Sequence, residues 1–325
     1  MATSRVPPSG VWCPAITFFH PQTDDLDLTA QAQYYTYLSK TGLAGLVILG
    51  TNAEAFLLTR EERKALISTA RRAVGPTFPI MAGVGAHSTR QVLKHIADAA
   101  EAGANSVLVL PPAYFGKATT PEVIERFYAD ISKNGSLPIV IYNFPGVCNG
   151  VDLDSAMITG LAHRHENIVG VKLTCGSVAK ITRLVAALPL EKFATFGGQS
   201  DFIIGGLSSG SAGCVAAFAN VFPKTIVRIY NLYQEGKVKE ALQLHQKAAL
   251  AEQSIKGGIG PTKYAAAIHS ARYAGIVGAV EKLKPRRPYV EPSNAVKETV
   301  KSTMAEVAKI EESLPLLPKS KSSML

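Results

Sequence analysis

The chain has 325 residues, of which 47% are hydrophobic and 18% are charged. This composition can bury a large core, and it excludes small disulfide scaffolds, coiled coils and disordered chains. The formal net charge of +9 is scattered, and no basic run is interleaved with aromatic residues, so we expect no nucleic-acid partner. The sequence contains no run of about 18 uncharged apolar residues, which predicts no membrane partner. We therefore expect a protein of the cytoplasm.

Short apolar runs recur along the chain at a spacing of roughly 30–35 residues, with helical patterns between them. The runs lack polar alternation, which is typical of parallel strands buried on both faces. They cover residues 11–19, 45–51, 79–85, 106–112, 137–143, 167–174, 192–198 and 211–218.

The intervening segments begin at recognisable helix caps. Thr59 and Glu62 form a capping-box pattern, Ser88 precedes a second helical pattern, and Thr120 followed by proline precedes a third. Eight strand–helix units predict an α/β fold, a (β/α)8 TIM barrel, over residues 10–236. An open doubly wound sheet is the alternative, but no GxGxxG motif opens the first helix.

After the barrel the pattern becomes purely helical. We expect a C-terminal helical appendage over residues 237–313 and a disordered tail over residues 314–325. The terminal Ser-Met-Leu resembles the peroxisomal signal Ser-Lys-Leu only loosely, so the cytoplasmic expectation stands.

Lys172 is the strongest single indication of function. It interrupts the apolar run 167–174, and lysines are almost never fully buried without a partner. It is either a lysine that extends from a strand end to solvent or a nucleophilic amine in an apolar pocket.

Other polar residues lie at the carboxyl ends of neighbouring strands, where barrels of this type carry their active sites. Tyr142 ends the adjacent run, where a phenol can pass protons to and from an amine. Thr51 and Asn52 follow Gly50 in a turn whose backbone N–H groups can hold a carboxylate. Glu54, just beyond, is expected to cap or orient the next helix.

The motifs GTNAE, PPAYF, YNFP and GVKLT, with a glycine-rich seventh strand, occur in this order. In order and spacing they resemble the dihydrodipicolinate synthase and N-acetylneuraminate lyase family of class I pyruvate aldolases. The resemblance extends from about residue 10 to residue 290.

The resemblance implies roles for individual residues. Lys172 would form an imine with pyruvate, so that neither cofactor nor metal is needed, and Tyr142 would relay protons. Thr51 and Asn52 would bind the pyruvate carboxylate, with the Thr51 hydroxyl also in the relay. Tyr114 would reach across the interface of a homodimer, or of a homotetramer, into a neighbouring site. The pocket near pyruvate would be lined by Gly197, Gly198 and Val215.

The chain departs from the family pattern at Val147. Dihydrodipicolinate synthases carry there an arginine that holds the carboxylate of the aldehyde substrate, and valine cannot make a charge-assisted hydrogen bond. We therefore expect a lyase that reversibly cleaves a 2-keto-3-deoxy sugar acid, such as 2-keto-3-deoxy-L-galactonate, to pyruvate and an aldehyde such as glyceraldehyde. The alternatives are 4-hydroxy-2-oxoglutarate aldolase and, disfavoured by Val147, dihydrodipicolinate synthase.

Three other functions are weighed against this one. The glycines near the seventh and eighth strands, from Gly197 to Gly213, could cradle a phosphate, but this leaves Lys172 and Tyr142 without roles. A metal-dependent aldolase would need clustered ligands, and His163 and His165 lie at the wrong end of the barrel. A non-catalytic ligand-binding barrel would have no use for the imine-forming lysine.

Overall fold

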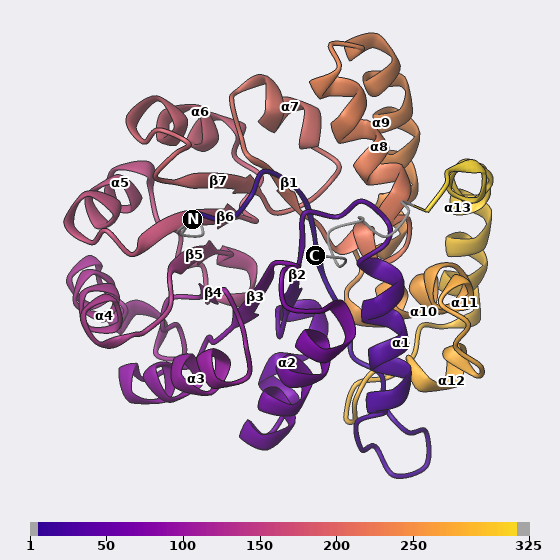
Figure 1. Cartoon of the computed structure of the whole chain (residues 1–325), viewed down its shortest axis with the longest axis horizontal. Coiled ribbons are helices and arrows are strands. Elements are labelled where there is room, and N and C mark those ends of the chain that lie inside the picture. Colours follow the sequence, from indigo (N-terminus) through magenta and orange to yellow (C-terminus); the bar gives the residue numbers. More distant parts are fainter. Residues whose placement is uncertain (1–5, 317–325) are drawn as a thin grey trace, which may run out of the picture.

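The computed structural model describes residues 6–316, and its centre is a closed barrel of eight parallel strands (Figure 1). The strands follow one another around the barrel in chain order, and β1 pairs with β8. Their bounds are β1 Gly10–Pro14, β2 Gly45–Ile48, β3 Ile80–Gly83, β4 Ser106–Val109, β5 Ile139–Asn143, β6 Ile168–Leu173, β7 Ala194–Gly197 and β8 Gly213–Val215. The expected TIM barrel is confirmed, and the open-sheet alternative is wrong because β1 and β8 close the ring.

A ring of helices surrounds the strands (Figure 1). These helices are α1 Leu28–Leu38, α2 Arg60–Val74, α3 Thr89–Glu101, α4 Pro121–Asn134, α5 Ser155–Arg164, α6 Val178–Ala187, α7 Ile203–Ser208 and α8 Pro223–Gln234. Thr59 and Glu62 form the predicted capping box at the start of α2. Ser88 and Thr120 accept backbone N–H groups at the starts of α3 and α4. Local capping therefore sets where these helices begin.

The apolar run over residues 11–19 forms a shorter strand than expected, because β1 ends at Pro14. Beyond this point the Ile16 N–H donates to Asn220 Oδ1 at 3.2 Å, and the Asn220 amide donates back to the Pro14 carbonyl at 2.9 Å. A buried side-chain amide thus replaces the neighbouring strand as the partner of the backbone. The second half of the run is apolar because it is buried, although it is not paired as a strand.

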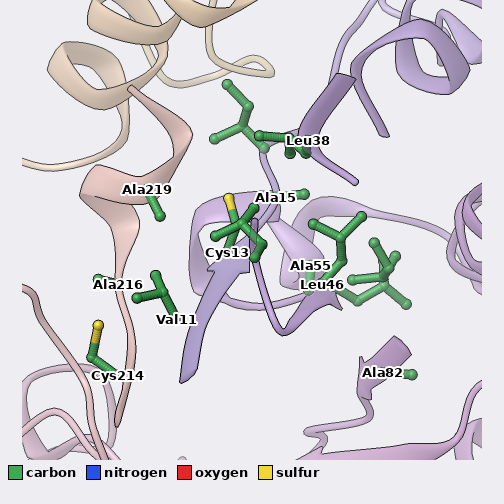
Figure 2. Close-up of a cluster of buried hydrophobic side chains, with 14 of the residues drawn as sticks. Val11, Cys13, Ala15, Leu38, Leu46, Ala55, Ala82, Cys214, Ala216 and Ala219 are labelled. Carbon is green, nitrogen blue, oxygen red and sulfur yellow. The ribbon is translucent and has the colours of Figure 1, made fainter. Parts of the chain in front are cut away.

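The core has two layers, because successive side chains of each strand point inward and outward. Trp12 points into the barrel, where its ring meets Phe196 edge-on with centroids 6.2 Å apart. Val11 and Cys13 belong instead to the outer layer between strands and helices, part of which Figure 2 shows with Leu46. Full burial of one such aliphatic side chain stabilises the fold by about 1.5–3 kcal/mol.

Helices after α8 gather on one side of the barrel, close to α8 and α1 (Figure 1). They are α9 Val238–Glu252, α10 Ile259–Ile268, α11 Ser270–Tyr273, α12 Ala279–Lys282 and α13 Asn294–Ser313. The α13 residue Glu311 accepts the N–H groups of Lys224 and Thr225 at 3.1 and 2.7 Å, so that it caps the first turn of α8. Burial raises the pKa of Glu311 above its usual range, and these hydrogen bonds oppose that rise.

Most of the expected tail, including the terminal Ser-Met-Leu, lies outside the described residues. Within residues 6–316, no helix combines the length and the apolar composition needed to cross a membrane.

Candidate functional site

Lys172 and Tyr142 lie side by side near the carboxyl ends of β6 and β5. The strand register pairs them directly, and their exposed fractions are 2% and 3%. Lys172 Nζ donates to Tyr142 Oη at 3.1 Å and lies 4.2 Å from the centre of the ring. Among the described residues Lys172 forms no ion pair. The amine is therefore held against a phenol, with which it can exchange a proton.

Thr51 extends this pair on the other side of Tyr142. Its Oγ1 lies 3.3 Å from Tyr142 Oη, and either hydroxyl can be the donor. Thr51 and Asn52 belong to the short 3-10 helix η1 Thr51–Ala53, which follows β2. In the described part of the chain, the Asn52 side chain and the backbone N–H groups of Thr51 and Asn52 make no hydrogen bond. These donors are available to a ligand.

An unusual backbone conformation at the end of β2 sets the position of the Thr51–Asn52 turn. Leu49 has a φ of +68°, in the left-handed region that non-glycine residues seldom occupy. A Cβ on Gly83 of β3 would come within 1.9 Å of the Leu49 carbonyl oxygen. Gly83 is therefore required where the chain leaves β2 towards Thr51.

Gly197, Gly198 and Val215 line the barrel at β7 and β8. A Cβ on Gly198 would lie 2.1 Å from Thr174 Oγ1, and one on Gly197 would lie 2.8 Å from the ring of Phe202. Val215 is buried among the inward-facing side chains. Close packing thus explains why both positions are glycine, so the glycines need no phosphate-binding role.

The loop after β5 carries Val147, which is 45% exposed in the 3-10 helix η4 Pro145–Val147. Asn143 anchors this loop, because its amide donates to Asp152 at 2.6 Å. Lys180 Nζ also lies 2.6 Å from Asp152. Burial tends to raise the pKa of Asp152, but the hydrogen bonds from Lys180 and Asn143 lower it below its usual range.

Tyr114 is not brought to Thr51 within this chain. Its side chain is 71% exposed, and its ring contacts those of His87 and Phe115, with centroids 5.8 and 5.2 Å away. The neighbouring loop supports it through Asn149, whose amide donates to the Ala113 carbonyl at 2.7 Å. The position of Tyr114 in the site stays a prediction.

Arg63 adjoins the candidate site, although no sequence motif pointed to it. It lies on the inner face of α2 and lines a small cavity together with Thr51 and Tyr142. One guanidinium nitrogen donates to the Gly83 carbonyl at 3.1 Å, whereas Nε has no partner. Burial lowers the pKa of Arg63 to about 10. An arginine at an apolar-face position, four residues before Ile67, was the available signal.

Glu54 stands at the N-cap position of the 3-10 helix η2 Ala55–Leu57, but its side chain makes no capping hydrogen bond there, and α2 is capped by Thr59. The capping part of the expectation is therefore wrong. The Glu54 carboxylate pairs instead with Lys263 of α10, with 2.5 Å between Oε1 and Nζ. Its other oxygen accepts the Arg286 N–H at 2.7 Å. No local pattern could reveal partners more than 200 residues away.

Among the described residues, no group of three or more His, Cys, Asp or Glu side chains is arranged to hold a metal ion. His163 lies in the last turn of α5 and His165 directly follows the helix.

A buried lysine beside a tyrosine, near the carboxyl ends of the strands of a (β/α)8 barrel, is an arrangement suited to covalent amine catalysis. Residues 7–307 match the Dihydrodipicolinate synthetase family, and the chain belongs to this family. The resemblance seen in the sequence motifs is confirmed.

Two similar proteins carry names that specify an aldolase activity. A protein of Coccidioides immitis, 69% identical over 95% of this chain and 99% of its own, bears the provisional name 4-hydroxy-2-oxoglutarate aldolase, mitochondrial. The L-threo-3-deoxy-hexylosonate aldolase of Hypocrea jecorina is 35% identical over 94% of this chain and 98% of its own. These names confirm the expected lyase class, and the first contradicts the expected cytoplasmic location, because that relative is named mitochondrial.

The fold has a close counterpart among solved structures. A crystal structure of a dihydrodipicolinate synthase family protein from Coccidioides immitis has a TM-score of 0.91 and 66% identity. The comparison covers 96% of this chain and 99% of that one.

Proposed function

We propose that this protein is a class I pyruvate aldolase that cleaves 4-hydroxy-2-oxoglutarate to pyruvate and glyoxylate through an imine on Lys172. The observation that carries the proposal is the row of Lys172, Tyr142 and Thr51, joined by contacts of 3.1 and 3.3 Å. Family membership and the name of the 69%-identical relative support it.

The reaction balances without a redox partner. Lys172 Nζ adds to the C2 carbonyl, and water leaves as the imine forms. The C4 hydroxyl then loses its proton and the C3–C4 bond breaks. The electron pair of that bond moves into the protonated imine, which becomes an enamine. Glyoxylate departs, C3 takes up a proton, and water releases pyruvate and the free amine.

Tyr142 is placed to move the protons of these steps, since its hydroxyl lies between the amine and Thr51 Oγ1. The free N–H groups of Thr51 and Asn52 suit a carboxylate, because the first N–H groups of a helical turn lack internal partners. We assign the wall of the pyruvate pocket to Gly197, Gly198 and Val215.

The substrate is where the sequence analysis and the relatives differ. The sequence motifs favour a 2-keto-3-deoxy sugar acid, whereas the name of the 69%-identical relative supports the alternative, 4-hydroxy-2-oxoglutarate. The sugar acid stays as the second candidate, because a 35%-identical relative bears that activity in its name and Val147 supplies no cation for an acidic aldehyde.

We also propose that the active unit is a homodimer or homotetramer in which Tyr114 serves a neighbouring site. Its exposed ring contacts the exposed ring of Phe115 and the ring of His87, and His87 in turn contacts exposed Phe56. Exposed clusters of large apolar side chains of this kind mark contact surfaces. Inactive Lys172→Ala and impaired Tyr114→Phe chains are mixed under conditions of subunit exchange. Activity above the sum of the separate variants is expected, and strictly additive activity would place Tyr114 in its own chain.

Borohydride trapping tests the proposed reaction. Treatment with pyruvate and borohydride should add one reduced pyruvyl group to Lys172, detected by mass spectrometry of the intact chain and its peptides. Labelling at another residue would refute the assignment. The rate of pyruvate release from 4-hydroxy-2-oxoglutarate and from 2-keto-3-deoxy-L-galactonate then decides between the two substrates.

A further inference from the structure

A buried ion pair joins the C-terminal helices to the loop that follows β2. Lys263 Nζ lies 2.5 Å from Glu54 Oε1, and the exposed fractions of the two side chains are 0% and 3%. The second carboxylate oxygen accepts the Arg286 N–H at 2.7 Å, and Lys263 also donates to the Lys284 carbonyl at 3.0 Å. Both oxygens of Glu54 are thus held by residues beyond position 260.

Glu54 is part of the turn that presents Thr51 and Asn52. Its N–H donates to the Thr51 carbonyl at 3.0 Å, and its φ of +58° is left-handed. With Leu49 on the other side, two non-glycine residues of left-handed backbone bracket the turn. Such conformations persist only where the surroundings hold them, and they gather at functional sites.

Arg286, from the same C-terminal region, also forms hydrogen bonds to the chain that follows the turn. The Arg286 guanidinium donates to both oxygens of Glu62 at 2.7 and 2.8 Å and to the Leu57 carbonyl at 3.2 Å. The cationic groups of Lys263 and Arg286 lie 4.6 and 5.1 Å from the centre of the Phe19 ring. The loop from Glu54 to Glu62 is therefore held from one side by charges of the C-terminal region.

We propose that Lys263 is a positioning residue for substrate binding, which acts through Glu54 to hold Thr51 and Asn52 in the geometry that receives the pyruvate carboxylate. This rests on the proposed function of that turn. A series of contacts connects the two buried lysines. Lys263 pairs with Glu54, whose N–H donates to the Thr51 carbonyl, and the Thr51 hydroxyl contacts Tyr142, which contacts Lys172. The C-terminal helices thereby contribute to the site without touching substrate.

The competing explanation is that the pair only docks the C-terminal helices on the barrel. Both explanations predict that Lys263→Met lowers the melting temperature, because it leaves a carboxylate buried without its cation. They differ for the double variant Glu54→Gln with Lys263→Met. That variant removes both charges, so we expect its melting temperature to recover. The turn can keep the hydrogen bond from the Arg286 N–H, but it stays without the ion pair to Lys263.

The test measures pyruvate affinity as the concentration that gives half-maximal borohydride trapping, at a temperature at which circular dichroism shows each variant to be folded. For Lys263→Met and for the double variant we expect this concentration to rise at least tenfold, with a smaller fall in the trapping rate at saturating pyruvate. If Lys263→Met does not fold, the double variant decides.

Lys282→Met is the matched control. Lys282 is also a C-terminal lysine paired with a buried carboxylate, Asp27 at 2.8 Å, but Asp27 caps α1 and lies outside the turn. The control should keep the parent affinity within twofold. Parent-like affinity in the double variant would overturn the positioning role, as would an equal loss in the control. A parent protein that traps no pyruvate would instead overturn the proposed function.

Discussion

At the ends of β5 and β6 a buried lysine faces a phenol, whereas at the junction of the β2 loop with α10 a buried lysine faces a carboxylate. Lys263 has the surroundings expected of a structural charge, with an ion pair, a carbonyl acceptor and an aromatic face. Lys172 has a hydroxyl partner and no ion pair among the described residues. The two lysines are equally buried, so the kind of partner, more than the burial, distinguishes the lysine that we propose to react from the lysine that we propose to position.

Exchange of each lysine for methionine should produce the largest difference between the two regions. Lys172→Met removes the nucleophile, so activity should fall on the order of 10⁴-fold or more. Its stability should be equal or higher, because an apolar side chain replaces a buried amine. Lys263→Met should instead lose about 3–5 kcal/mol of stability from the unpaired carboxylate. Pyruvate release and urea unfolding of both variants measure the two effects, and similar profiles for the two would contradict the distinction.

Tyr142→Phe tests the importance of the partner, because it removes the hydroxyl beside Lys172 and keeps the ring. Pyruvate should still enter, but kcat should fall about 10²–10⁴-fold, the usual size of a general acid–base contribution. Steady-state kinetics of pyruvate release provide the measurement. An unchanged kcat would reduce Tyr142 to a packing role.

Val147→Arg adds a cation to the loop that follows β5. A guanidinium there can hold a carboxylate, so the preference for aspartate semialdehyde over glyceraldehyde as the partner of pyruvate should rise about tenfold. Rates of condensation with the two aldehydes give the ratio. Efficient use of aspartate semialdehyde by the parent protein would show that Val147 does not set the choice.

The last expected effect concerns pH and the C-terminal region. Burial lowers the pKa of His269 to about 4, whereas an unfolded histidine titrates near ~6.5. The folded state therefore binds fewer protons between these values, and its stabilisation is present above pH ~6.5 and lost as pH falls towards 4. The loss should be on the order of 1–3 kcal/mol.

His269→Phe should keep the contact with Phe222, whose ring centre lies 4.7 Å away, and should reduce the difference in unfolding free energy between neutral and acidic pH. His95, whose pKa burial also lowers to about 4, leaves part of the dependence in place. Exposed His163, changed to glutamine, serves as the control. An unaltered pH dependence in His269→Phe would assign the acid sensitivity elsewhere.

The sequence predicted the barrel because each strand is an apolar run with its own turn and cap, which are local properties. It located Lys172 because a charge inside an apolar run is conspicuous. Lys263 escaped notice, because in PTKYAAAIHSARY a lysine resembles an ordinary exposed helix residue. The end of β1 was misplaced for the same reason, since Asn220 lies 204 residues from the Ile16 N–H that it accepts. Partners that only the closed barrel brings together leave no local signal.

The link between Glu54 and Arg286 also bears on the order in which the protein acquires activity during synthesis. These residues are 232 positions apart, so at about 5–20 residues per second the ribosome adds the second about 10–50 s after the first. A nascent chain that already contains all eight strands still lacks the charges that hold the Thr51–Asn52 turn. Synthesis must therefore pass the last strand by some 70 residues before the Thr51–Asn52 turn can be held by these contacts.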